Sequence, residues 1–375
     1  MKIGGIMVNV FDYLYWRGDL EFNVVPFNEI DNLIMSRLSY FPIEKITELK
    51  SFTIKQLFSE CSKPEFDKSI FIMKDDLKLL ETIANSKRYA EIKIDNFVQQ
   101  IDFELEQQFG ALVVVLPNNY IYVSYRGTDN TFVGWKEDFN LTFLDSIPSQ
   151  SMALSYLKKL KINIFTKIIL GGHSKGGNLA VYAAMNCSDK IKKQIVAIYN
   201  NDGPGFMENI INSDKYKSIN ERIITIIPQT SIVGKLLNYN GAHKVVQSTQ
   251  KLIMQHDLYS WQIEVDHLLY ADDIDENSKK ICKTINEWLA KTPFDQREKF
   301  FEIIYNVLNS TNAVTFPEFE KNLYGNLKTM YDSYKNVSPE DKELITKLIE
   351  FFLKSIKDNF IPKVSIPSFP FMRKN

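Results

Sequence analysis

Ser174 has the surroundings of a nucleophile. Residues 172–176 read Gly-His-Ser-Lys-Gly, the G-x-S-x-G pattern of a sharp turn between a strand and a helix. Glycines flank the serine because such a turn is too tight for a Cβ on either side. The turn would hold the hydroxyl clear of the sheet, beside helix amides that can stabilise negative charge. The pattern favours nucleophilic attack by Ser174 over a serine that only forms a turn.

The flanking segments supply the context that this motif requires. Residues 167–170 have the length and branching of a buried parallel strand. The stretch of residues 178–187 has one small, apolar helical face made of Ala180, Ala183, Ala184 and Cys187. The sequence therefore predicts strand, tight turn and helix in direct succession.

A serine hydroxyl needs a base within hydrogen-bond reach and an acid that orients the base. The chain has four histidines, and His173, next to the nucleophile, is expected to point into the core. We favour His256 as the base, because its place between the last strand-rich region and the first C-terminal helix fits the order Ser, acid, His. The alternatives are His243, in a loop rich in Gly and Asn, and His267, a surface or capping residue.

Asp202 is the candidate acid. The predicted strand of residues 194–199 leads through Asn200 and Asn201 to Asp202, and the carboxyl ends of parallel strands share one edge of a sheet. The next predicted strand, residues 222–227, is followed by Thr230 and Ser231 and by no carboxylate. That absence favours Asp202, although Asp-Gly can also be only a turn.

An oxyanion hole needs two convergent N–H donors. The first should be the amide of Lys175, directly after the nucleophile. We assign the second to the amide of Thr128, in the loop after the predicted strand of residues 120–125, with its hydroxyl as a further donor. A Ser-Lys mechanism through the Lys175 side chain is disfavoured, because adjacent residues on such a turn point apart.

Alternation of strands and helices predicts an α/β fold with a mainly parallel central sheet flanked by helices. Residues 111–116 and 120–125 form a predicted hairpin, and residues 150–161 a predicted helix. C-terminal helices follow, with apolar faces at Ile281, Ile285 and Leu289, at Phe300, Ile304, Val307 and Leu308, and beyond a capped start at Ser338.

Three parts of the chain are expected. Residues 1–90 form a helical, aromatic segment packed on the core, residues 91–290 the α/β core, and residues 291–375 a helical extension. Within the extension, the proline-containing tail of residues 361–375 should be an extended arm or disordered.

For the N-terminal segment, two predictions concern single residues. Asn28 should cap a helix, with Asp31 in the capping-box position. Arg17 and Asp19 could form a functional pair, but a structural ion pair that locks the segment onto the core is favoured.

Composition limits the partners and the compartment. With 375 residues and a net charge of −1, the chain offers no electrostatic reason to bind nucleic acid. Its three cysteines, Cys61, Cys187 and Cys282, lie far apart, so we expect reduced core residues and no metal, cofactor or disulfide framework. Without a signal-peptide pattern or a run of about 18 apolar residues, a cytoplasmic protein is expected.

Several motifs in order resemble known families. Tyr-Arg-Gly-Thr-Asp at residues 125–129, followed by Trp135, Asp138 and the serine turn, resembles the class 3 lipase branch of the α/β-hydrolases. Residues 13–20, 26–31 and 134–139 resemble the Mbeg-like proteins, a bacterial lipase-like family, and the resemblance covers about residues 10–290.

The resemblance implies the α/β-hydrolase fold, an esterase or lipase-like site and no defined substrate. Class 3 lipases carry the acid after the strand that here precedes Thr230 and Ser231. Asp202 follows the strand before that one, and in this position it looks like the acid of pancreatic-type lipases.

The expected function is therefore a serine hydrolase that cleaves a small-molecule or lipid carboxylic ester through an acyl-enzyme on Ser174. One alternative is an inactive scaffold that binds a protein partner through residues 291–375. Another is a lipase at a membrane surface, for which residues 232–237 are a candidate apolar lid, although packing in a loop or core is favoured for them.

Overall fold

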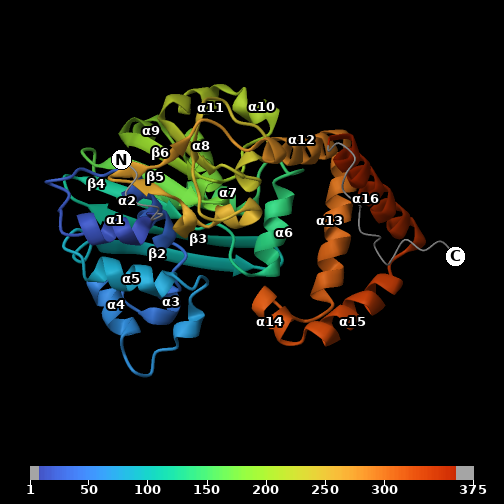
Figure 1. The fold of residues 1–375 in the computed structure, drawn as a ribbon, viewed down its shortest axis with the longest axis horizontal. Helices are drawn as coiled ribbons and strands as arrows, with labels where there is room; N and C mark the ends of the chain where they lie inside the picture. Colours follow the sequence, from blue (N-terminus) through green and yellow to red (C-terminus); the bar gives the residue numbers. More distant parts are fainter. Residues whose placement is uncertain (1–7, 360–375) are drawn as a thin grey trace.

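A nine-stranded sheet is the centre of the computed structural model, which describes residues 8–359 (Figure 1). Its strands lie in the order β1-β2-β3-β4-β5-β6-β7-β8-β11. Their bounds are β1 Ser51–Thr53, β2 Lys93–Asp102, β3 Gln107–Leu116, β4 Tyr120–Tyr125, β5 Lys167–His173, β6 Ile195–Asn201, β7 Ile223–Pro228, β8 His243–Val246 and β11 Tyr270–Ala271. Strands β9 (Ile263–Glu264) and β10 (His267–Leu268) form a separate two-stranded sheet.

The five central strands, β4 to β8, run parallel, and antiparallel strands flank them on both sides. This arrangement confirms the predicted α/β fold with a parallel centre. The predicted hairpin is confirmed as β3 and β4, where Asn118 and Asn119 both have positive φ. Pro117, Asn118 and Asn119 connect the paired residues Leu116 and Tyr120, and residues with positive φ are typical of such tight hairpin connections.

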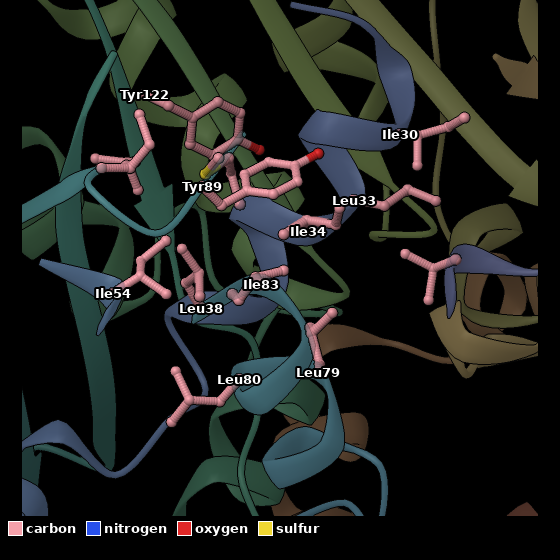
Figure 2. Close-up of a cluster of buried hydrophobic side chains, with 14 of the residues drawn as sticks. Ile30, Leu33, Ile34, Leu38, Ile54, Leu79, Leu80, Ile83, Tyr89 and Tyr122 are labelled. Carbon is pink, nitrogen blue, oxygen red and sulfur yellow. The ribbon is translucent and has the colours of Figure 1, made fainter. Parts of the chain in front are cut away.

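Helices from the N-terminal part of the chain cover one face of the sheet. They are α1 Val10–Arg17, α2 Glu29–Leu38, α3 Ile43–Ile46, α4 Ile54–Cys61 and α5 Asp76–Ala84. Figure 2 shows Ile34 and Leu38 of α2 in one buried cluster with Ile83 of α5 and Tyr122 of β4. Burial of this cluster fixes α2 against the middle of the sheet.

The opposite face is covered mainly by α7 and α8. Along the chain, the helices that occur between β4 and β7 are α6 Phe132–Asn140, α7 Pro148–Lys159, α8 Lys175–Asn186, α9 Asp189–Gln194, α10 Glu208–Ile211 and α11 Asp214–Lys217. Ala180, Ala183 and Ala184 of α8 are fully buried, so their small side chains let this helix lie close to the strands on either side of it.

Short 3-10 helices occur in the connections. They are η1 Lys68–Ile70, η2 Asn220–Arg222, η3 Val233–Lys235, η4 Leu252–His256 and η5 Leu258–Ser260. Of these, η3 and η4 belong to the candidate site.

Polar contacts also attach the N-terminal helices to the core. The capping box of Asn28 and Asp31 is present, and Asp31 in addition forms a fully buried ion pair with Arg88 at 2.6 Å. Arg17 Nη2 lies 4.0 Å from Asp266 Oδ2 of the core, an ion pair of the favoured structural kind, and forms no ion pair with Asp19 within the described residues.

The last helices lie together at one end of the sheet (Figure 1). They are α12 Glu276–Lys291, α13 Phe294–Asn309, α14 Phe316–Lys321, α15 Leu323–Lys335 and α16 Pro339–Asn359. A small core joins α12, α13 and α16, in which Trp288 Nε1 donates to the carbonyl of Leu348. The predicted tail of residues 361–375 lies outside the described residues.

The buried face of α13 differs from the prediction. Phe301 and Ile303 are buried, whereas Ile304 is 40% exposed. Phe301 stacks on Phe139 of α6 with ring centroids 4.2 Å apart. Because α13 packs on α6 on one side and on α16 on another, a single helical stripe does not describe its contacts.

Candidate active site

Ser174 occupies a sharp turn between β5 and α8. Its backbone has φ 57° and ψ −135°, a region that non-glycine residues rarely adopt and that marks strain at functional positions. A Cβ on Gly172 would lie 2.4 Å from the backbone of Gly176, and a Cβ on Gly176 would lie 2.1 Å from the carbonyl oxygen of Tyr125. Glycine is thus required on both sides of the serine, as the sequence predicts.

Asp202 follows β6 directly, at the same edge of the sheet as Ser174. Its amide donates to the carbonyl of Ile226 on β7, and the residue is 1% exposed. The Oδ2 atom lies 2.6 Å from Nδ1 of His256, the last residue of η4. The structure therefore brings together the two residues that the sequence paired only by their order in the chain.

The other carboxylate oxygen of Asp202 is also occupied. Oδ1 accepts hydrogen bonds from Ser231 Oγ at 2.5 Å and from the Gly234 amide at 3.1 Å. These donors lie in the loop after β7, which corresponds by the resemblance to the acid-bearing region of class 3 lipases but in which the sequence offers Thr230 and Ser231 and no carboxylate. Here that loop contributes donors that hold the carboxylate of the preceding strand.

This loop includes residues 232–237, the candidate apolar lid. Gly234 contacts Asp202, and the carbonyl of Leu236 accepts from the Gly205 amide. The segment is thus packed against Asp202, in agreement with the favoured packing role.

The contact with Asp202 sets the tautomer of His256. A carboxylate only accepts, so Nδ1 carries the proton and Nε2 keeps its lone pair for a proton from outside. The His256 side chain is 25% exposed and therefore accessible from solvent. No hydrogen bond joins Ser174 Oγ to His256 among residues 8–359, and in free enzymes such bonds often shorten only when substrate binds.

The two expected oxyanion donors lie next to the turn. Thr128 follows Gly127, where an added Cβ would lie 3.1 Å from the Cβ of Ser174, and Lys175 begins α8. Within the described part of the chain, neither amide has a hydrogen-bond partner. Both are therefore free to donate to an oxygen beside Ser174.

The Thr128 hydroxyl has a different role from the expected one. It donates to the carboxylate of Asp138 on α6, at 2.7 and 2.6 Å from the two oxygens. Burial raises the pKa of Asp138 to about 6, opposed by the positive charge of Lys175. Asp138 thus fixes the loop that carries the Thr128 amide, and its place in the family motif was the only sequence signal for this role.

The Lys175 side chain points away from the reacting groups. Its Nζ lies 2.7 Å from Glu137 Oε2 and also donates to the backbone and side-chain oxygens of Gln108 at 3.0 Å. Both partners of this ion pair are buried. A Ser-Lys mechanism therefore has no support, and the pair links the serine turn to α6.

The remaining histidines lie elsewhere or have other partners. His243 begins β8, where burial lowers its pKa, and His267 is exposed beside Asp266 at 3.2 Å. His173 is buried, as expected, but its Nε2 reaches the carbonyl of His256 at 2.7 Å. No sequence signal indicated this contact.

A cavity of about 820 Å³ lies apart from these groups. It is lined by residues from the loops after β6 and β7 and from α12 and α13, including Met207, Leu237, Leu289 and Phe294. Ser174, Asp202 and His256 do not line this cavity.

Comparison with known proteins gives one family. A family model described as Mbeg1-like matches residues 83–306, more than half of the chain. A search of the curated proteins finds no match. Among residues 8–359, no helix has both the length and the apolar composition needed to cross a membrane.

Two solved lipase structures are similar to this chain, with low sequence identity and low TM-scores. One is M37 lipase, with a TM-score of 0.38 and 14% identity over 86% of this chain and 99% of that chain. The other is a fungal lipase in complex with an inhibitor, with a TM-score of 0.37 and 14% identity over 72% of this chain and 96% of that chain.

Proposed function

The chain belongs to the Mbeg1-like family, and we propose that it is a serine hydrolase of carboxylic esters. The observation that carries this proposal is the 2.6 Å contact between Asp202 Oδ2 and His256 Nδ1, at the sheet edge where Ser174 sits on its strained turn. This contact leaves His256 Nε2 free to act as a base.

In the proposed acylation step, His256 Nε2 takes the proton of Ser174 Oγ while that oxygen attacks the ester carbonyl carbon. The carbonyl oxygen becomes negative and accepts hydrogen bonds from the amides of Thr128 and Lys175. As the bond to the alcohol oxygen breaks, His256 returns the proton to the leaving alcohol. An ester of Ser174 remains.

Deacylation repeats these steps with water. His256 removes a proton from the water molecule as its oxygen attacks the acyl carbon, and then returns the proton to Ser174 Oγ. The products are one carboxylic acid and one alcohol for each ester and water consumed. Asp202 stays ionised throughout and stabilises the His256 imidazolium.

The surroundings of the base favour an apolar, lipid-like ester. Leu252, Ile253 and Met254 lie on η4, separated from His256 by Gln255, and are 56%, 50% and 61% exposed. Three consecutive exposed apolar side chains beside a reacting group would lie against an acyl chain or a lipid surface.

A second candidate function is the inactive scaffold that binds a protein partner. Exposed apolar side chains on α15, at Leu323, Tyr324 and Leu327, support it. The absence of a Ser174 to His256 hydrogen bond within the described residues is also consistent with it.

Labelling with a fluorophosphonate probe separates these functions. We expect the wild-type protein to be labelled and S174A to remain unlabelled. Ser151, an exposed serine on α7, supplies the matched control S151A, which should be labelled like wild type. A folded wild-type protein that takes up no more probe than S174A would refute the hydrolase and favour the scaffold.

A further inference from the structure

We propose that His173 is a positioning residue for the base: its Nε2–H holds the main chain of His256 and so sets the base relative to the nucleophile. The proposal rests on the hydrolase function proposed above. It concerns a side chain that takes no part in the triad.

The direction of this hydrogen bond follows from its partners. His173 Nε2 lies 2.7 Å from the carbonyl oxygen of His256, and a carbonyl only accepts, so Nε2 carries the proton. Nδ1 of His173 then has the lone pair, and Tyr40 Oη lies 3.3 Å from it. His173 and His256 are therefore opposite tautomers.

The environment of His173 keeps it neutral. The residue is 6% exposed, and burial together with the neighbouring His256 lowers its pKa well below the ordinary value. Arg37, whose guanidinium carbon lies 4.3 Å from the Tyr40 ring centroid, acts in the same direction. A neutral His173 has one donor and adds no charge beside the base when His256 takes up a proton.

The base needs such an anchor because η4 is an exposed segment. Its backbone is held at Gln255, whose carbonyl accepts from the indole of Trp261 at 2.8 Å. At His256 itself, Asp202 holds the side chain and His173 holds the carbonyl. The two imidazole rings lie with their centroids 4.3 Å apart.

His173 is also the residue directly before the nucleophile, at the end of the buried strand β5. A displacement of η4 relative to this strand would change the distance over which the proton moves. Displacements of about 1 Å can cost on the order of 100-fold in rate. The hydrogen bond thus couples the positions of nucleophile and base independently of Asp202.

A matched pair of variants tests the donor. The amide nitrogen of Gln can occupy the place of the histidine Nε2, whereas the shorter Asn cannot reach it. We expect H173N to lower the rate of fluorophosphonate labelling and kcat on a soluble ester at least about tenfold, with KM within about twofold, and H173Q to recover most of the loss. Labelling of H173N at the wild-type rate, or equal losses in folded H173N and H173Q, would overturn the proposal.

The tautomers supply a test that requires no substitution. In ¹⁵N-labelled wild-type protein, NMR should show the proton of His173 on Nε2 and that of His256 on Nδ1. A His173 proton on Nδ1 would overturn the inference even if a variant fails to fold. If the probe does not label wild type while NMR shows the expected tautomers, the hydrolase function fails and the contact between the two histidines stands.

Discussion

Ser231 Oγ lies 2.5 Å from Asp202 Oδ1, so the loop after β7 supplies a hydrogen bond to the carboxylate that directly follows β6. This carboxylate is 1% exposed, and its two oxygens accept from Ser231, Gly234 and His256. The Asp202 side chain is thus oriented by partners on both of its oxygens. A rotation of the carboxyl group would break both sets of contacts.

The first prediction concerns Ser231. In S231A the buried carboxylate loses a donor, which should cost about 1–3 kcal/mol of unfolding free energy. Looser orientation of Asp202 should also lower kcat/KM about tenfold, or about 1.4 kcal/mol. Urea unfolding and ester hydrolysis measure the two effects, with S151A as the control. Unchanged values in both assays would mean that Ser231 does not hold the acid.

Much of this site could be predicted from the sequence because each element carries a local signal. The glycines around Ser174 indicate a tight turn. The apolar run before Asp202 indicates a buried strand that ends near this residue. His256 had no motif of its own, and only the order of residues along the chain indicated it.

The remaining contacts of the site could not be predicted, because they join segments far apart in the chain. Ser231 donates to Asp202 across two strand ends, and His173 donates to a backbone carbonyl, which any residue type could offer. Lys175 and Glu137 pair only because α6 lies beside the serine turn. A contact between two single residues that lie far apart in the chain produces no periodic pattern in the sequence.

The elements of the fold also differ in how far the sequence predicts them. The long strands β3 to β7 were predicted from their apolar runs, whereas the short strands β8 and β11 were not. A strand of two to four residues is defined by its hydrogen-bonded neighbour more than by its own composition. Helices α14 and α15 were also missed, and their exposed apolar residues obscure the helical pattern.

The second prediction concerns the pH dependence of stability at Asp138. Burial raises its pKa from 3.8 to about 6, so the folded state holds the proton more tightly than the unfolded state. This contribution to stability is complete below pH 3.8 and is lost as the pH rises through about 6.

Comparison of wild type with D138N isolates this effect. Relative to D138N, the urea midpoint of wild type should fall between about pH 4 and pH 6 and then stay level. D272N, at an exposed aspartate, is the control and should follow wild type. Parallel curves for wild type and D138N across this range would contradict the raised pKa.

The third prediction concerns the buried pair of Lys175 and Glu137. K175M leaves the Glu137 carboxylate buried without its cation, which should cost about 3–5 kcal/mol of unfolding free energy. The double variant K175M/E137Q should recover part of the loss, since a neutral amide needs no counter-ion.

Urea unfolding of the two variants measures this coupling. The exposed pair of Lys347 and Glu343 on α16 provides the control, because K347A should leave the midpoint unchanged. A double variant no more stable than K175M would show that the charge of Glu137 is not what destabilises the single variant.

The fourth prediction concerns the exposed apolar residues beside the base. If Ile253 and Met254 lie against a lipid surface, I253S/M254S should weaken action on substrate held in a bilayer. We expect about a tenfold fall in the ratio of two rates, one on a long-chain ester in phosphatidylcholine vesicles and one on a short soluble ester. That fall corresponds to the loss of partial burial of two apolar side chains.

Ile164 supplies the control for this prediction. It is 67% exposed and precedes β5, at the opposite end of that strand from Ser174. I164S should therefore keep the wild-type ratio. A ratio that falls equally in I164S and I253S/M254S would indicate a general effect of surface polarity, and a ratio unchanged in I253S/M254S would mean that η4 does not contact the lipid.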